Sequence, residues 1–216
     1  MSTYLRQTNL DEALAALANS KFTVLAGGTD YYPARVGKPI NDDILDISGI
    51  ASLRGIRDEG SRWRIGATTT WSDLTESNLP PLFDGLKAAA REVGGVQIQN
   101  AGTLGGNLCN ASPAADGVPP LLALDALVEI ADAAGSTSVA LADFILGNRK
   151  TALRPGQLLA AILVPKPAHE ARSHFLKLGA REYLVVSIAM AAATLEIEAG
   201  RVRAARIAVG ACSPVA

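Results

Sequence analysis

The chain has 216 residues, of which 49% are hydrophobic and 19% charged, and its formal net charge is −1 at pH 7. This balance excludes the basic surface of a nucleic-acid-binding protein, and no apolar stretch is long enough to span a membrane. The N-terminus lacks the apolar run of a signal peptide, so a cytoplasmic protein is expected. Two cysteines and two histidines give no ligand pattern for a metal or an iron–sulfur cluster. No catalytic triad or carboxylate pair stands out either, so any chemistry would need a cofactor.

Helix and strand patterns alternate over the first third of the chain. Asn9 followed by Glu12 is typical of a helix start, and this helix should end near residues 19–20. The apolar run Phe22-Thr23-Val24-Leu25-Ala26 is typical of a strand buried on both faces. It leads into the glycine turn Ala26-Gly27-Gly28-Thr29-Asp30. Further strands are expected at residues 43–47 and 63–67.

The middle of the chain is predicted to be rich in helices. Thr70 can cap a short helix, and Pro81 can begin a longer one that ends near Gly94-Gly95. An extended segment should then lead into a second glycine turn, Gly102-Thr103-Leu104-Gly105-Gly106-Asn107. Pro165-Lys166-Pro167 is the candidate domain boundary. The remaining expected elements are a helix at 121–124, a strand at 127–130 with a turn at Gly135-Ser136, and strands at 175–178, 188–198 and 203–209.

Both glycine turns have the chemistry to wrap an anionic group. Glycine permits positive φ and close approach of the main chain, so successive N–H groups can point into one concavity. Neither turn fits the G-x-G-x-x-G or the G-x-x-x-x-G-K-[ST] pattern, and either alone could be an ordinary turn. The presence of two such turns in one domain favours a ligand with two phosphates that both turns bind. A dinucleotide is therefore the first hypothesis. Asp30 would repel a phosphate, so we expect its side chain to cap the turn.

Together these motifs resemble the FAD-binding (medium) subunits of the molybdenum hydroxylase family, such as those of carbon monoxide dehydrogenase and xanthine dehydrogenase. The two turns are similar to the family's pair of FAD pyrophosphate loops. Three further matches follow in family order: Ala111-Ser112-Pro113-Ala114-Ala115-Asp116, Arg149-Lys150-Thr151-Ala152-Leu153-Arg154-Pro155 and Phe175-Leu176-Lys177. The resemblance implies an α+β fold. Residues 1–167 would form a two-subdomain FAD-binding domain of the PCMH/VAO type, and residues 168–216 an incomplete C-terminal antiparallel-sheet domain.

The resemblance also implies which residues bind FAD. Asp116 matches a family aspartate that lies along the FAD, and Leu159 and Lys177 match positions at the flavin end. Tyr183 corresponds to a tyrosine near the flavin in the carbon monoxide dehydrogenase branch. Lys177 could instead be a solvated strand lysine, and Tyr183 a core tyrosine. Attachment should be non-covalent because no histidine precedes His169. The pyrophosphate and ribose would be held by Leu25, Ala26, Gly27, Gly28, Thr29, Asp30, Gly102, Thr103, Leu104, Gly105, Gly106 and Asn107.

The function implied by the resemblance is that of an oxidoreductase subunit for electron transfer. A large molybdopterin subunit would oxidise the substrate, and a small subunit with [2Fe-2S] clusters would pass the electrons to FAD. The acceptor would be NAD⁺, a quinone or oxygen. The complex is expected to be a dimer of heterotrimers, with molybdopterin and [2Fe-2S] only on the partner subunits. No residue of this chain is expected to be catalytic or to bind a metal.

Two other functions remain open from the sequence. One is a stand-alone FAD-dependent reductase or oxidase of the same FAD-binding fold, which would need its own substrate pocket and proton donor. The other is a structural subunit whose glycine turns bind nothing. Two features of the chain depart from the pattern of the molybdenum hydroxylase family. No cysteine lies between Asp116 and Asn148, which argues against the branch with an extra iron–sulfur cluster, and the C-terminal domain is about half the family length.

Overall fold

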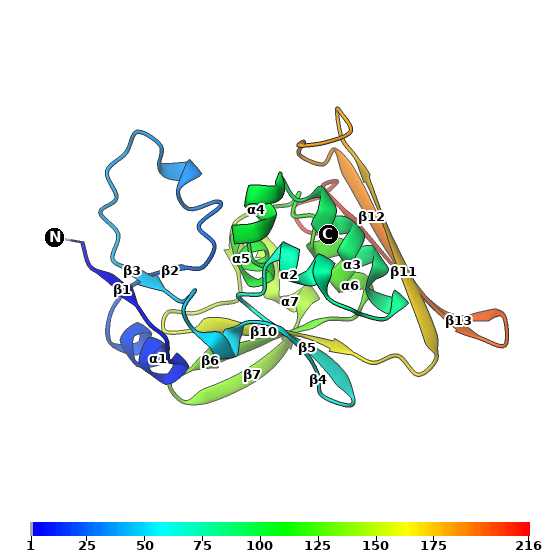
Figure 1. Cartoon of the computed structure of the whole chain (residues 1–216), viewed down its shortest axis with the longest axis horizontal. Coiled ribbons are helices and arrows are strands. Elements are labelled where there is room, and N and C mark those ends of the chain that lie inside the picture. Colours follow the sequence, from blue (N-terminus) through cyan, green and yellow to red (C-terminus); the bar gives the residue numbers. More distant parts are fainter. Residues whose placement is uncertain (1) are drawn as a thin grey trace.

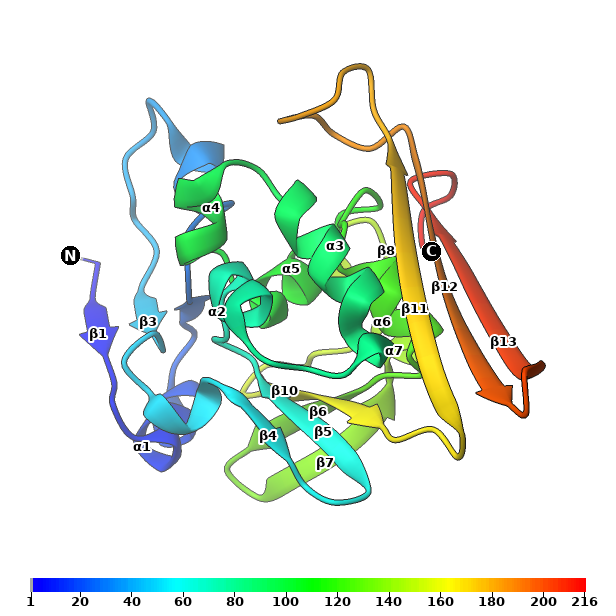
Figure 2. The same ribbon diagram turned by 45° about the vertical axis from the view of Figure 1, so that its right-hand side comes forward.

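The computed structural model describes residues 2–216, so Met1 of the predicted FAD-binding domain lies outside them. Helices and strands are mixed along the chain and form three main sheets (Figure 1). We call these the N-terminal, central and C-terminal sheets. Most of the helices lie between the central and C-terminal sheets, as the turned view shows (Figure 2).

The N-terminal sheet is parallel and small. Its strands β1 (Tyr4–Arg6), β2 (Thr23–Leu25) and β3 (Ile44–Asp46) pair in the order β1-β3-β2. Helix α1 (Leu10–Asn19) begins where the Asn9 side chain accepts hydrogen bonds from two backbone N–H groups, as predicted. The strand expected at 22–26 is shorter, and its central Val24 is 37% exposed, so burial on both faces is wrong. The reason is that the cavity described below opens beside β2.

The central sheet is antiparallel with five strands. Its order is β4 (Ile56–Asp58), β5 (Arg62–Gly66), β10 (Leu158–Pro165), β6 (Leu127–Asp132) and β7 (Gly135–Ala140). The sequence prediction missed β10, although it is the middle strand and is buried from Leu158 to Val164. The turn expected at Gly135-Ser136 is also misplaced, because both residues pair with β6.

Short helices cover one face of the central sheet. They are α2 (Trp71–Glu76), α3 (Asp84–Glu92), α4 (Val96–Ala101), α5 (Leu104–Asn110), α6 (Val118–Ala123) and α7 (Leu141–Phe144). Trp71, Phe83, Leu86 and Phe144 are fully or almost fully buried with the sheet residue Ile65 in one core. A two-stranded hairpin, β8 (Ile145–Gly147) and β9 (Lys150–Thr151), follows α7.

The extended segment expected before the second glycine turn is wrong, because those residues form α4. Gly95 precedes this helix and accepts the backbone N–H of Ile98, and the Gly102 N–H closes the last turn on the Ile98 carbonyl. The Ser72 hydroxyl on α2 donates to the Asn100 side chain on α4. The hydrogen bond to α2 stabilises α4, whose glutamine and asparagine residues give little sign of a helix in the sequence.

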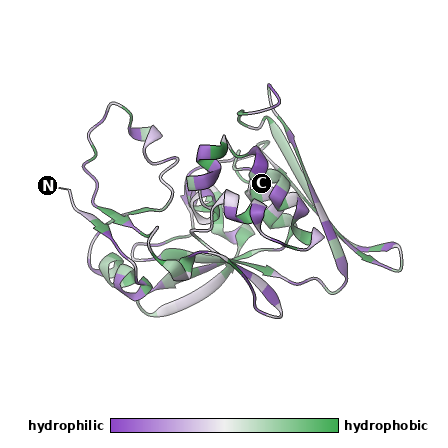
Figure 3. Cartoon of the chain, viewed as in Figure 1, coloured by the Kyte–Doolittle hydropathy of each residue, from purple (hydrophilic) through white to green (hydrophobic). Residues whose placement is uncertain are grey.

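The C-terminal sheet contains the longest strands, β11 (Glu170–Leu178), β12 (Ala189–Glu198) and β13 (Arg201–Gly210), in an antiparallel order. Its inner face packs Phe175, Met190 and Ala192 against Ala89 of α3 and Ala123 of α6. In the hydropathy colouring, the first part of β12 is toward the hydrophobic end of the scale (Figure 3). This packing places the end of β11 and the start of β12 beside the helices that border the cavity.

Candidate functional site

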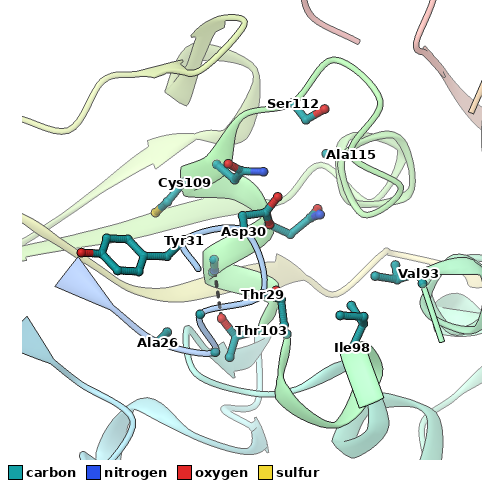
Figure 4. Close-up of a pocket in the computed structure, with 18 of the residues that line it drawn as sticks. Ala26, Thr29, Asp30, Tyr31, Val93, Ile98, Thr103, Cys109, Ser112 and Ala115 are labelled. Atoms are coloured by element: carbon teal, nitrogen blue, oxygen red, sulfur yellow. Dashed lines mark hydrogen bonds between the residues drawn. The ribbon is translucent and has the colours of Figure 1, made fainter. Parts of the chain in front are cut away.

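A cavity of about 1210 Å³ separates the N-terminal sheet from α4 and α5. It exceeds the range of roughly 300–1,000 Å³ that is usual for pockets of small ligands, so a long ligand suits it. Figure 4 shows Thr29 and Thr103 where the two glycine turns approach each other, with Val93 and Ile98 on one side and Tyr31 and Cys109 on the other in that view.

The first glycine turn follows β2 and lies directly on the start of the second. A Cβ atom built on Gly27 would lie 1.8 Å from the carbonyl oxygen of Ala101, so only glycine permits this approach. Gly28 has φ +69°, and a Cβ there would also meet the Tyr32 ring at 2.7 Å. Glycine at both positions is therefore required by contact and by backbone conformation.

The backbone donors of this first turn are free. Within the described residues, the N–H groups of Gly27, Gly28, Thr29 and Asp30 donate to no protein acceptor. All four residues line the cavity. A run of unpaired N–H groups on a turn is a binding site for an anion such as a phosphate. The expected cap by the Asp30 side chain is wrong, since that carboxylate is exposed and accepts no hydrogen bond from the described part of the chain.

The second turn uses its donors inside the fold. The N–H of Leu104 donates to Thr69, and that of Gly105 donates to Ala67, both at about 3 Å from the carbonyl oxygen. The Thr103 hydroxyl and carbonyl accept the N–H groups of Gly106 and Asn107, which caps α5. The expectation that both turns offer N–H groups to a ligand is therefore wrong for Leu104–Asn107. This turn instead shapes the cavity wall.

Asn107 and Thr103 are the polar side chains that the second turn contributes to the cavity. The Oδ1 atom of Asn107 is buried and has no hydrogen-bond partner among the described residues. A buried carbonyl oxygen without a donor costs about 1–3 kcal/mol. A ligand hydroxyl or N–H group that reached this atom would remove that cost.

A buried ion pair stands at the end of the cavity near α3. Asp116 lines the cavity, and its Oδ2 atom lies 2.8 Å from Nζ of Lys177 on β11. The Ser187 hydroxyl donates to the other carboxylate oxygen, Oδ1, at 2.7 Å. Lys177 also donates to the carbonyl oxygen of Glu92 at 3.3 Å. Both oxygens of the carboxylate are thus held by side chains from the C-terminal sheet region.

The structure brings most of the predicted site residues to one cavity. Leu104 is fully buried and lies outside its lining, Lys177 lies behind Asp116 and lines a smaller neighbouring pocket, and Tyr183 is 66% exposed and lines neither. The core position considered for Tyr183 is therefore wrong. Those that line the main cavity are Leu25, Ala26, Gly27, Gly28, Thr29, Asp30, Gly102, Thr103, Gly105, Gly106, Asn107, Asp116 and Leu159.

Sequence reasoning missed the α3–α4 turn and several side chains of the cavity wall. The missed residues include Val93, Gly94, Gly95, Ile98, Tyr31, Arg35, Arg149, Leu153 and Gln157. The Gly94-Gly95 pair gave a signal, but it was interpreted only as a helix stop. The guanidinium of Arg35 lies 3.7 Å from the centre of the Tyr31 ring and forms an ion pair with Asp42. The sequence does not predict these contacts of Arg35, because its partners lie several residues away in a loop.

Cys109 also lines the cavity, on α5. The residue is exposed to the cavity, and desolvation by the surrounding protein raises the pKa of its thiol to about 12. The group is therefore a neutral thiol at physiological pH. Among the described residues, no group of three or more His, Cys, Asp or Glu side chains could hold a metal ion. None of the helices in residues 2–216 has the length and apolarity to cross a membrane.

Comparisons with known proteins agree with this geometry. A family model described as the FAD binding domain in molybdopterin dehydrogenase matches residues 1–167. The xanthine dehydrogenase FAD-binding subunit of Escherichia coli O157:H7 is 33% identical over 222 residues, which cover 99% of this chain and 75% of that protein. The carbon monoxide dehydrogenase medium chain of Afipia carboxidovorans is 33% identical over 174 residues, covering 76% of this chain and 58% of that one. The reconstituted carbon monoxide dehydrogenase of Oligotropha carboxidovorans has a chain that superimposes with a TM-score of 0.89 and 30% identity, over 100% of this chain and 76% of its own length.

Proposed function

Because the chain belongs to the family of FAD-binding domains of molybdopterin dehydrogenases, we propose that it is the FAD-binding electron-transfer subunit of a molybdenum-containing dehydrogenase. The observation that carries this proposal is the run of free N–H groups from Gly27 to Asp30 in a cavity long enough for a dinucleotide. When bound, FAD supplies both one-electron and two-electron transfer.

The residues present fit this cofactor. The free N–H groups of the first turn suit the pyrophosphate, whose charge they would neutralise without a side-chain cation. The orphaned Oδ1 atom of Asn107 suits a hydroxyl donor such as that of a ribose. A Cβ on Gly106 would meet only the Thr103 hydroxyl, at 2.8 Å, so the second turn stays open on its cavity side. We therefore propose these residues, with Asp116 and Leu159, as the FAD site.

The chain's own contribution is to bind, orient and enclose the cofactor. The first turn binds its charged centre, and the capped start of α5 keeps the facing wall rigid. Apolar side chains such as Leu153, Leu159 and Val93 exclude water from parts of the wall. Within this proposal no side chain acts as an acid, a base or a nucleophile, which agrees with the absence of a catalytic pattern in the sequence.

We also propose a finer organisation, based on the resemblance to this family. We place a PCMH-type, two-subdomain FAD-binding domain at residues 1–167 and a separate C-terminal antiparallel-sheet domain at residues 168–216. A small iron–sulfur subunit and a large molybdopterin subunit are the partners, assembled as a dimer of heterotrimers in the cytoplasm. The antiparallel C-terminal sheet and the location of the cavity between two layers support this division.

The test is reconstitution of the purified chain with FAD. The expected result is a yellow protein with one FAD per chain that is released as free FAD on heating. A colourless chain that binds no added FAD would contradict the proposal. Co-purification with proteins that contain iron and molybdenum identifies the subunit role, whereas full-rate reduction of a small substrate by NADPH with the isolated chain would identify a stand-alone reductase.

A further inference from the structure

The ion pair of Asp116 and Lys177 is almost fully buried, although Asp116 lines the cavity. The Lys177 side chain is 6% exposed and that of Asp116 is 10% exposed. Ser187 is also buried, and its hydroxyl reaches Asp116 Oδ1 while Lys177 reaches Oδ2. The three side chains come from the segment before α6, from β11 and from the segment before β12. They connect parts of the chain that are 61 and 71 residues apart.

These contacts fix the ends of one loop on the cavity. Residues 179–188 connect β11 to β12, and we call the part up to Ser187 the 179–187 loop. Lys177 lies just before this loop, and Ser187 is its last residue. Within this loop, Leu184, Val185 and Val186 line the cavity. A Cβ on Gly95 would lie 3.5 Å from the Leu184 side chain, so the loop reaches the start of α4. The serine and lysine therefore hold both ends of the loop to the same carboxylate.

The same contacts determine the charge of the cavity wall. An ammonium group buried alone would present a full positive charge in a medium of low dielectric constant. Asp116 supplies the countercharge at 2.8 Å, so the pair is neutral as a whole. A carboxylate free to turn away would leave that ammonium uncompensated. The Ser187 hydrogen bond opposes such a turn because it holds the oxygen that Lys177 does not.

We propose that Ser187 is a positioning residue of the site: it locks the Asp116 carboxylate against Lys177, which keeps the 179–187 loop on the cavity and the buried ammonium compensated. This inference deepens the proposed function, and its redox part rests on it. A net positive charge in the wall favours the state of a bound cofactor with more negative charge. The charge-compensated pair therefore keeps the reduction potential of bound FAD lower than a lone lysine would.

The first test uses the loop itself and needs no FAD. Arg181 lies inside the loop and is a cleavage site for trypsin. In Ser187→Ala we expect cleavage after Arg181 to be about tenfold faster, the equivalent of one hydrogen bond to a charged group at 1.4 kcal/mol per tenfold. Ser136→Ala, an exposed serine on β7, is the matched control and should not change that rate. Equal rates in Ser187→Ala and the unaltered chain would overturn the positioning role.

The second test measures the midpoint potential of bound FAD, which depends on the charge compensation between Asp116 and Lys177. Asp116→Asn should make the midpoint potential more positive, because Lys177 loses its countercharge. The double variant Asp116→Asn/Lys177→Met should return it toward the unaltered value, since both charges are gone. An unchanged potential in Asp116→Asn with FAD still bound would overturn the charge compensation. Failure of the unaltered chain to bind FAD would instead contradict the proposed function. The trypsin test would then still decide whether Ser187 holds the loop in place.

Discussion

The glycine turn after β2 and the glycine turn that begins α5 meet at one cavity, yet they use their backbone donors differently. From Gly27 to Asp30 the N–H groups have no acceptor among the described residues, whereas from Leu104 to Asn107 every N–H group is bonded within the fold. Similar small residues thus serve two purposes. The first turn is prepared for an anion, and the second is a rigid wall on which the first turn rests.

The largest expected effect comes from separating the two turns. Gly27→Ala would place a Cβ 1.8 Å from the Ala101 carbonyl oxygen, so the backbone of one turn must move. We expect a loss of about 3 kcal/mol in the free energy of unfolding and no measurable FAD binding. Denaturant unfolding and FAD titration measure the two effects. Retention of both properties would show that the close contact between the turns is not needed.

The next prediction separates the binding role of the first turn from the effect of backbone strain alone. Gly28 and Gly37 both have positive φ, at +69° and +75°, but only Gly28 lines the cavity, and a Cβ at Gly37 meets nothing within 4 Å. Gly37→Ala should cost about 1 kcal/mol of stability through backbone strain alone. Gly28→Ala should cost more, because its Cβ would also meet the Tyr32 ring at 2.7 Å. Only Gly28→Ala should weaken FAD binding, by at least about tenfold, because it distorts the free donors. Equal affinities in the two variants would contradict a binding role for this turn.

A change in the second turn should lower the stability of the fold but have little effect on the affinity for FAD. Thr103→Ala removes the hydroxyl that caps α5 at the Gly106 N–H. Loss of such a cap costs about 1 kcal/mol of stability. The affinity for FAD should fall by much less than in Gly28→Ala, since the turn's N–H groups are not ligand donors. Thermal unfolding and FAD titration of both variants test the division, and a reversed order of the two affinities would contradict it.

The smallest effect concerns the thiol of Cys109 in the cavity wall. Its pKa of about 12 lies above the ordinary value of 9.0, so the folded chain keeps the proton that the unfolded chain releases. The contribution to stability is therefore complete below pH 9 and falls as the pH rises toward 12. Both cysteines are exposed, but the raised pKa leaves less thiolate at Cys109, so at pH 8.5 iodoacetamide should modify Cys109 more slowly than Cys212. Equal or faster modification of Cys109 at that pH would contradict the raised pKa of its thiol.

The sequence allowed part of this structure to be predicted, for identifiable reasons. Local signals located α1, through the Asn9 cap, and α2, through the Thr70 cap. Both signals depend on residues within one helical turn. The family resemblance located the FAD-binding domain, and most of the residues that it indicated do line the cavity.

The missed features depend on distant parts of the chain. Helix α4 has no strong helical pattern and depends on α2, and β10 is an apolar run that only its neighbours β5 and β6 identify as the central strand. The hydrogen bonds of the second turn go to Ala67 and Thr69, more than 30 residues away. No local pattern shows whether a glycine turn keeps its donors free, because that depends on which strand or loop lies beside it.

Amide hydrogen exchange, measured residue by residue with and without FAD, tests the contrast between the turns most directly. Without FAD, the amides of Gly27–Asp30 should exchange fast, and those of Leu104–Asn107 should be protected by their bonds within the fold. Addition of FAD should protect the first group strongly and change the second little. Slow exchange of the first turn without FAD, or FAD-dependent protection confined to the second turn, would contradict this account.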